Sequence, residues 1–162
     1  MTTLVIDELR NSLPLTQKIN LVNELRSRVS AIRLHLMGFN NPTGDIKMAI
    51  LRDDVEVDSV TQSLATIKAS IDAALGVSED YWHGMILFQL DETIVLERGQ
   101  DIKIQLEDST GYTFSESSYL GWVKEHENLK NTRFEDDPLN PFENPFTFEL
   151  WKYKNEQDTR FF

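Results

Sequence analysis

The sequence predicts an all-β protein, a two-sheet antiparallel β-sandwich with little helix and a jelly roll as its leading topology. Apolar and polar side chains alternate along several short segments, as they do in strands that bury one face. Clusters of turn-forming residues separate these segments, which is typical of sandwiches. Because alternation does not determine strand order, an immunoglobulin-like sandwich is the alternative topology.

The chain has the size of one domain, which we expect to span residues 1–162. A domain of this length buries roughly 70% of the surface that its unfolded chain exposes. With 40% hydrophobic and 10% aromatic residues, the chain can fill such a core without disulfides or metal. We expect an N-terminal arm with the first strands at 1–28, a long polar loop at 124–145 and a C-terminal tail at 155–162.

The first clear alternation lies in residues 32–36, where three aliphatic side chains share one face while Arg33 and His35 take the other. Residues 39–45 are rich in turn formers, and the alternation resumes in residues 46–50. This arrangement predicts a hairpin with a long loop.

Alternation continues through the middle and the end of the chain. Residues 82–90 and 102–106 alternate, and residues 98–100 supply a turn between them. A last strand is expected to begin at about Phe146, because the residues before it include three prolines, which do not fit a central strand. These are Pro138, Pro141 and Pro145. Weaker alternation predicts three shorter strands at residues 18–22, 55–60 and 119–123.

Two segments fit more than one secondary structure. The apolar residues between 64 and 75 match helical spacing, but the alternation at 66–71 matches a strand equally well. We expect a strand at 66–71, followed by at most one helical turn. The apolar residues of segment 2–13 would line one side of a short helix.

The composition argues against some classes of partner. The chain has 16 basic and 27 acidic side chains and a net charge of −11. Nucleic acids and anionic membranes attract basic proteins, so we expect neither as a partner. The absence of cysteine removes disulfide scaffolds and thiol nucleophiles. No secretory signal precedes the fold and no apolar run approaches the ~20 residues of a membrane span, so synthesis in a cytosol is expected.

Three segments carry a resemblance to a known class of protein. Residues 29–36 (VSAIRLHL) and 42–50 (PTGDIKMAI) resemble the opening hairpin of β-sandwich modules in virion proteins of tailed bacteriophages and in some bacterial surface proteins. Residues 94–104 (IVLERGQDIKI) resemble the glycine turn and next strand of those modules, and the likeness extends over about residues 29–123. The modules commonly have Tyr in the strand after this turn, where this chain has Ile102.

The resemblance implies a non-enzymatic structural or interaction protein located in a virion and made in the host cytoplasm. Capsid decoration and attachment of a tail or fibre are the roles that such modules commonly serve. It also implies that the partners are other virion proteins. The alternative function is a carbohydrate-binding module or a receptor-recognition domain.

Paired carboxylates are the strongest candidates for catalysis, since glycoside hydrolysis needs two of them across the sugar. Glu107 with Asp108, at a strand end, and Asp53 with Asp54, in a turn, are such pairs. Acids at these places are usually solvated, so we predict no catalytic residue and no enzyme activity.

The histidines give no support for a metal or cofactor. His35, His83 and His126 lie far apart in the sequence, without the short spacing of a zinc motif. His35 and His83 fall on the polar side of their strands, which predicts surface or inter-strand histidines. We therefore expect no metal ligand and no cofactor.

Aromatic residues mark one candidate binding site. Tyr112, Tyr119 and Trp122 lie close together in the sequence among serines and carboxylates. Carbohydrate sites present Tyr and Trp faces to sugar rings, with polar groups alongside. The same composition fits a loop whose aromatic residues anchor it to the core. The sequence leaves both interpretations open.

The C-terminal region carries candidate partner-binding residues. Trp151 and Tyr153 have the opposite parity to the apolar residues of 146–150, so large rings occupy both faces of the last strand. Such a strand is covered on both faces, by the N-terminal segment or by a neighbouring subunit. Leaving Phe161 and Phe162 in water forgoes roughly 1.5–3 kcal/mol each. We therefore expect them to pack on their own domain or on a neighbour, and we expect a homo-oligomer, a trimer being the first guess.

Overall fold

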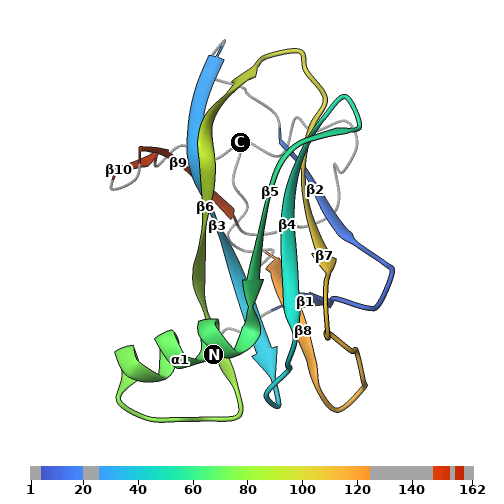
Figure 1. Ribbon diagram of the computed structural model, residues 1–162, viewed down its shortest axis with the longest axis vertical. Helices are drawn as coiled ribbons and strands as arrows, with labels where there is room; N and C mark the ends of the chain where they lie inside the picture. The colour runs from blue at the N-terminus through green and yellow to red at the C-terminus, as the bar shows by residue number, and fades with distance from the viewer. Residues whose placement is uncertain (1–4, 20–25, 125–147, 154–155, 159–162) are drawn as a thin grey trace.

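The computed structural model describes residues 5–19, 26–124, 148–153 and 156–158. The elements in chain order are β1 (Val5–Glu8), β2 (Leu15–Ile19), β3 (Arg26–Phe39), β4 (Asp45–Arg52), β5 (Val55–Ser63), α1 (Leu64–Leu75), β6 (Trp82–Glu97), β7 (Ile102–Asp108), β8 (Tyr119–Lys124), β9 (Phe148–Tyr153) and β10 (Glu156–Asp158). Ten strands form two antiparallel sheets within these residues (Figure 1). The predicted all-β, two-sheet antiparallel sandwich is confirmed.

The first sheet has the order β1-β8-β3-β9-β10, with β6 on the other edge of β3, and the second sheet has the order β2-β7-β4-β5. Four antiparallel pairs are nested inside one another along the chain. They are β1 with β8, β2 with β7, β3 with β6, and β4 with β5. From β1 to β8 the chain therefore changes sheet at every connection except the β4–β5 hairpin.

This strand order corrects one expectation. The alternating segments 32–36 and 46–50 do not form a hairpin, because they lie in β3 and β4, which belong to different sheets. Segments 82–90 and 102–106 likewise lie in β6 and β7 of opposite sheets, so the turn between them crosses the sandwich. Alternation shows which face of a strand is buried, but it carries no information on the strand's neighbours.

The core fills the space between the two sheets. Trp122 and Phe88 of the first sheet are fully buried, and so are alternate residues of the second sheet, such as Ile104 and Met48. Each large apolar side chain buried in this way contributes roughly 1.5–3 kcal/mol. The two sheets are therefore held together by the inward residues of the strands named here.

The segment predicted as a strand at 66–71 is instead the middle of helix α1. Leu64 and Ile67 are buried and Ile71 packs against the core, which is one face of a helix. The Ser63 side chain accepts a hydrogen bond from the Thr66 backbone N–H at the N-terminus, and Gly76 ends the helix in a left-handed conformation. The helix contacts β5 and β6 at one end of the sandwich (Figure 1). The 12 residues of α1 are too few to cross a bilayer. Among the described residues, no helix is long and apolar enough to do so.

The remaining expectations concern the ends of the chain. The helical interpretation of segment 2–13, which the sequence left open, is wrong, because residues 5–8 form β1, which pairs with β8. The expected strand at 18–22 lies earlier, as β2, whereas those at 55–60 and 119–123 are present as β5 and β8. The last strand is described from Phe148 onward, and within the expected tail Glu156–Asp158 forms β10. The loop segment 125–145 lies outside the described residues.

Candidate functional site

Several loops meet at one end of the sandwich, which is the lower end in Figure 1. The β3–β4 loop binds the segment after α1, because the Asn41 backbone N–H donates to the Asp80 carbonyl oxygen at 3.0 Å. It also binds the β7–β8 loop, because Asn40 Nδ2 donates to the Ser117 carbonyl oxygen at 2.9 Å. These bonds hold three loops that are distant in sequence in one arrangement.

The β1–β2 loop is bound to the β7–β8 loop by the Asn11 side chain. Asn11 Nδ2 donates to the Tyr112 carbonyl oxygen at 2.8 Å, and Asn11 Oδ1 accepts from the Phe114 backbone N–H at 2.7 Å. An amide that donates and accepts in this way fixes the orientation of the loop to which it binds. Asn11 thus fixes the backbone at Phe114, whose partly buried ring packs against the edge of the core.

Four aromatic rings form a continuous line across these loops, which we call the aromatic row: Tyr81, Phe39, Tyr119 and Phe114. Tyr81 meets Phe39 edge to face, with ring centroids 4.7 Å apart. Phe39 and Tyr119 are opposite each other on β3 and β8, and their rings stack at 4.9 Å with 9° between planes. Phe114 follows at 5.8 Å from Tyr119. These are favourable aromatic geometries, so the row is an ordered unit.

The ends of the aromatic row differ in chemistry. At one end the Arg10 guanidinium lies 4.4 Å from the centre of the Phe114 ring, and it also pairs with Glu8 at 2.9 Å. At the other end Tyr81 is 51% exposed. The open end of the row is therefore an aromatic ring that carries a hydroxyl.

Polar groups flank the open end. Asn41 Nδ2 donates to Asp80 Oδ1 at 2.7 Å, beside Tyr81 in sequence. Burial raises the pKa of Tyr119, and the nearby Glu8 carboxylate and Tyr81 raise it further. The Tyr119 hydroxyl therefore stays protonated at neutral pH and can donate a hydrogen bond. Amide, carboxylate and phenol groups beside aromatic rings are the donors and acceptors of a site for a polyhydroxylated ligand.

The structure corrects the predicted aromatic set. Tyr112 and Trp122 are 3% and 0% exposed, so they present no face to a ligand. Trp122 is paired with Leu36 on the inward side of its strand, and the Tyr112 hydroxyl bonds to backbone groups inside the sandwich. Only Tyr119 of the predicted three lies in the aromatic row. Phe39, Tyr81 and Phe114 were missed, although the outward parity of Phe39 could have indicated it.

The predicted partner-binding residues lie elsewhere. Backbone pairing places Trp151 of β9 opposite Ala31 of β3, and Tyr153 opposite Glu156 of β10. Phe161 and Phe162 lie outside the described residues. These residues and the aromatic row are therefore not brought together by any contact that the structure describes.

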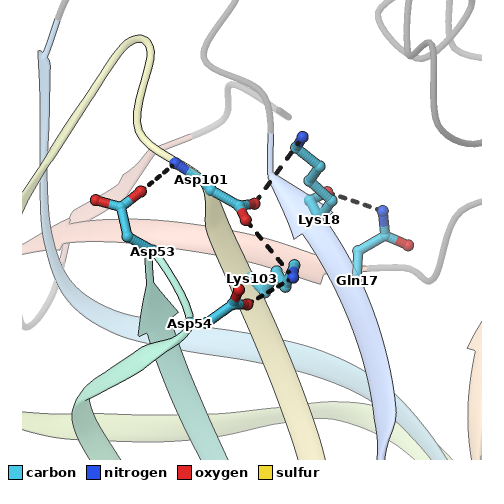
Figure 2. A network of polar contacts seen from close by, with 6 residues as sticks. All are labelled: Gln17, Lys18, Asp53, Asp54, Asp101 and Lys103. Atoms are coloured by element: carbon cyan, nitrogen blue, oxygen red, sulfur yellow. Dashed lines mark hydrogen bonds and ion pairs between the residues drawn. The ribbon is translucent and has the colours of Figure 1, made fainter.

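A charged network lies near the opposite end of the sandwich, at the β4–β5 turn (Figure 2). Lys103 Nζ is 2.8 Å from Asp54 Oδ1 and 3.6 Å from Asp101 Oδ2, and the Asp54 bond raises the pKa of Lys103. Asp53 and Asp54 have φ of 52° and 65°, as a two-residue hairpin turn requires. Asp53 Oδ1 accepts from the Asp101 backbone N–H at 3.1 Å. This candidate catalytic pair therefore has structural partners.

The other candidate catalytic pair, Glu107 and Asp108, also has structural partners. Glu107 lies 3.6 Å from Lys47 Nζ. Asp108 accepts from the Ser12 backbone N–H at 3.0 Å and from Asn11 Nδ2 at 3.3 Å. Both carboxylates hold neighbouring strands and loops together. A pocket of about 260 Å³ beside the first network is lined by residues 18–19 and 97–102, and its Lys18 pairs with Asp101 at 3.9 Å.

Two histidines meet on the outer face of the first sheet, the face turned away from the second sheet. His35 Nε2 and His83 Nδ1 are 3.1 Å apart, so the rings share a hydrogen bond between strands β3 and β6. Burial lowers the pKa of His35, and the charge of His83 lowers it further. Among the described residues, no three or more His, Cys, Asp or Glu side chains gather as a metal site.

Comparisons with known proteins give no assignment. No family model, curated protein or solved structure matches the chain.

Proposed function

We propose that the protein is a non-enzymatic binding protein with jelly-roll topology, and that its aromatic row recognises a carbohydrate. The topology rests on the nested pairs β1–β8, β2–β7, β3–β6 and β4–β5. A long antiparallel ribbon paired in this manner and rolled across two sheets is the strand plan of a jelly roll. Jelly rolls are frequent in lectin and viral capsid domains.

The observation that carries the proposed function is the line of contacting aromatic rings that ends at Tyr81. Sugars have apolar faces that pack on aromatic rings, and hydroxyl groups that need hydrogen-bond partners at the edge of the ring. Tyr81 is half exposed and has the Asn41–Asp80 pair beside it, so both requirements are met at one place. The stacked Phe39 behind Tyr81 keeps its ring in position before a ligand arrives.

The charges around the aromatic row favour a neutral glycan. Glu8 and Asp80 lie beside it, and Arg10 is already paired with Glu8. The chain as a whole carries a charge of −11. An anionic polysaccharide would be repelled by this field, whereas a neutral one would not.

A glycan array of neutral and acidic glycans, followed by calorimetric titration of each hit, tests the proposal. We expect saturable binding to a neutral glycan, with a Kd that rises about tenfold or more in Tyr81→Ala, because one stacking ring and its hydroxyl are lost. Val55→Ala is the matched control: Val55 is 65% exposed, but it lies in the turn region at the opposite end. Its affinity should equal that of the wild type.

Two results would contradict carbohydrate recognition by the aromatic row. One is the absence of saturable binding to every glycan on the array. The other is a bound glycan whose affinity is the same in wild type and Tyr81→Ala. Phe39→Leu adds a second check, because it removes the supporting ring while keeping an apolar side chain.

A second candidate function is a structural component of a phage particle, as a capsid decoration or an attachment module of a tail or fibre. It is supported by the place of the segments that resemble virion modules. Residues 29–36, 42–50 and 94–104 fall on four of the eight strands from β1 to β8, namely β3, β4, β6 and β7. Mass spectrometry of purified particles from producing cells tests it, since a chain made in the cells but absent from particles would refute it.

The same role includes a homo-oligomer, with a trimer as the first guess. Accessory proteins of symmetric particles assemble with the symmetry of their attachment point. Light scattering on the full chain and on a chain that ends at Lys154 measures the assembly state. We expect an oligomer that is lost on truncation while the β-sheet circular dichroism signal remains. A full-length monomer at high concentration would contradict the expectation.

A further inference from the structure

Four side chains form a compact block on the outer face of the first sheet, which we call the His–Met block: His35, Met37, His83 and Met85. Cross-strand register places His35 opposite Met85, and Met37 opposite His83. All four have outward parity, because their strand neighbours Leu36 and Ile86 are buried. Side chains directly opposite each other in a sheet have Cβ atoms about 4.5–5.5 Å apart. The register therefore places two imidazoles and two thioethers at adjacent positions on one face of the sheet.

Most of the histidines and half of the methionines in the chain lie in the His–Met block. The chain has 3 histidines, 4 methionines and no cysteine. Two of each fall in these four adjacent positions. Met48 is fully buried on the other sheet, where it belongs to the hydrophobic core. No thiolate elsewhere in the chain competes for a soft metal ion.

The two histidines have the separation of a pair of metal ligands. His35 Nε2 and His83 Nδ1 are 3.1 Å apart. Two imidazole nitrogens, each about 2.0–2.1 Å from one ion at angles between square and tetrahedral, lie about 2.9–3.4 Å from each other. An ion beside the line between the two nitrogens can therefore bind both, once each ring turns its lone pair from the other nitrogen toward the ion.

We propose that the His–Met block is a binding site for a monovalent copper ion. Imidazole and thioether together select copper, because the thioether is a soft ligand and hard cations require oxygen ligands. The block holds no carboxylate, so its ligand set is neutral. Such a neutral set with thioether ligands suits the soft, singly charged Cu(I) ion better than a hard divalent ion, which prefers oxygen ligands. The inference is independent of glycan recognition at the aromatic row.

The protonation states of the block agree with metal binding. A metal ligand must be a neutral imidazole, and burial together with the charge of His83 lowers the pKa of His35. The His35 ring is therefore neutral at pH 7. Binding needs the tautomers that carry hydrogen on His35 Nδ1 and on His83 Nε2, which leave the two facing nitrogens free to coordinate.

Anaerobic titration of the full chain with Cu(I), in competition with a chromophoric Cu(I) chelator, tests the proposal. We expect one ion per chain and X-ray absorption with both nitrogen and sulfur neighbours of copper. His83→Gln should weaken Cu(I) affinity by at least about tenfold, and so should the double variant Met37→Leu/Met85→Leu. Zn(II) measured in parallel should bind more weakly than Cu(I) and should be insensitive to the methionine substitutions.

The matched control is Met48→Leu, which is the same substitution in the core of the other sheet. It should leave Cu(I) affinity unchanged, and its circular dichroism should match that of the wild type. Three results would overturn the proposal: no measurable Cu(I) competition, absorption spectra without sulfur, or equal affinity in wild type and His83→Gln. Affinity lost in His126→Gln but kept in His83→Gln would place the ion elsewhere and would overturn it as well.

Discussion

The Tyr112 hydroxyl donates a hydrogen bond of 2.6 Å to the carbonyl oxygen of Leu9. The Tyr112 hydroxyl oxygen in turn accepts a hydrogen bond from the Leu120 backbone N–H at 3.0 Å. One side chain of the β7–β8 loop thus joins the end of β1 to β8 inside the sandwich. Burial raises the pKa of Tyr112, so the hydroxyl keeps the proton that it donates.

Tyr112→Phe is expected to destabilise the fold by about 2–4 kcal/mol. The substitution keeps the ring but leaves two buried backbone groups, Leu9 C=O and Leu120 N–H, without their partner, at about 1–3 kcal/mol each. Urea unfolding followed by circular dichroism measures the loss. Tyr119→Phe is the control, because its ring is half-buried on the outer face and should cost less than about 0.5 kcal/mol. Equal losses in the two variants would contradict the role given to the Tyr112 hydroxyl.

Gly44→Ala is expected to be among the most damaging single substitutions. Gly44 has φ of +94°, and a Cβ there would lie 2.2 Å from the Tyr112 backbone nitrogen. Backbone cannot move aside as a flexible side chain can, so the loss of unfolding free energy should exceed about 3 kcal/mol.

Gly99→Ala is the matched control for this substitution. Gly99 has φ of +91° with open space around it. Only the cost of the left-handed backbone applies there, about 1–2 kcal/mol. Thermal unfolding of both variants separates the cost of backbone strain, which both share, from the cost of the steric clash at Gly44. Similar melting temperatures for the two variants would refute the close approach at Gly44.

The inward residues of the strands could be predicted from the sequence, but their partners could not. Ile102, Ile104 and Leu106 alternate in the sequence and are all buried in β7. The same reasoning joined residues 32–36 to 46–50 as a hairpin, whereas β3 pairs with β6. The two-residue alternation of apolar and polar side chains shows only which face of a strand is buried. Which strands pair depends on contacts between residues far apart in the chain.

Helix α1 was missed although its signals are present in the sequence. Alternation and helical spacing both fit residues 64–75, so periodicity could not decide between them. The residues at the two ends of this segment distinguish a helix from a strand. Ser63 directly precedes the first apolar residue and Gly76 follows the last, which are the positions of an N-cap and a left-handed C-cap.

The candidate sites combine residues that only the fold brings together. The Phe39 and Tyr81 rings meet edge to face, although β4, β5 and α1 separate the two residues in the sequence. His35 and His83 are 48 residues apart. The sequence predicted that both histidines lie on polar faces, but spacing along the chain could not show that they share one face of one strand pair.

Gly38→Ala is expected to displace the Trp82 ring. The two residues are directly opposite on β3 and β6, and a Cβ on Gly38 would lie 2.1 Å from Trp82 Nε1. Overpacking of this kind costs about 1–3 kcal/mol. Tryptophan emission and urea unfolding should both change. Gly84→Ala is the control, because its nearest side-chain atom is Ile71 Cδ1 at 4.0 Å, and this variant should keep or gain stability. A larger loss in Gly84→Ala would contradict the packing described.

The His35–His83 pair predicts a fall in stability as the pH is lowered from 7.5 to 5.5 in the presence of a chelator. The pKa of His35 in the folded chain lies below its ordinary value of 6.5, because burial and the charge of His83 disfavour protonation. Between the lowered pKa and 6.5 the unfolded chain therefore binds more protons than the folded chain, and stability decreases as the pH falls through this window. Above 6.5 the contribution is fully present. Asp72, whose pKa is lowered from 3.8, titrates in a more acidic range and does not interfere.

His83→Gln removes the neighbouring charge while the burial of His35 remains, so its loss of stability between the two pH values should be smaller than that of the wild type. Urea unfolding at pH 7.5, 6.5 and 5.5 measures the difference, and parallel pH profiles for the two proteins would show that the histidines titrate independently.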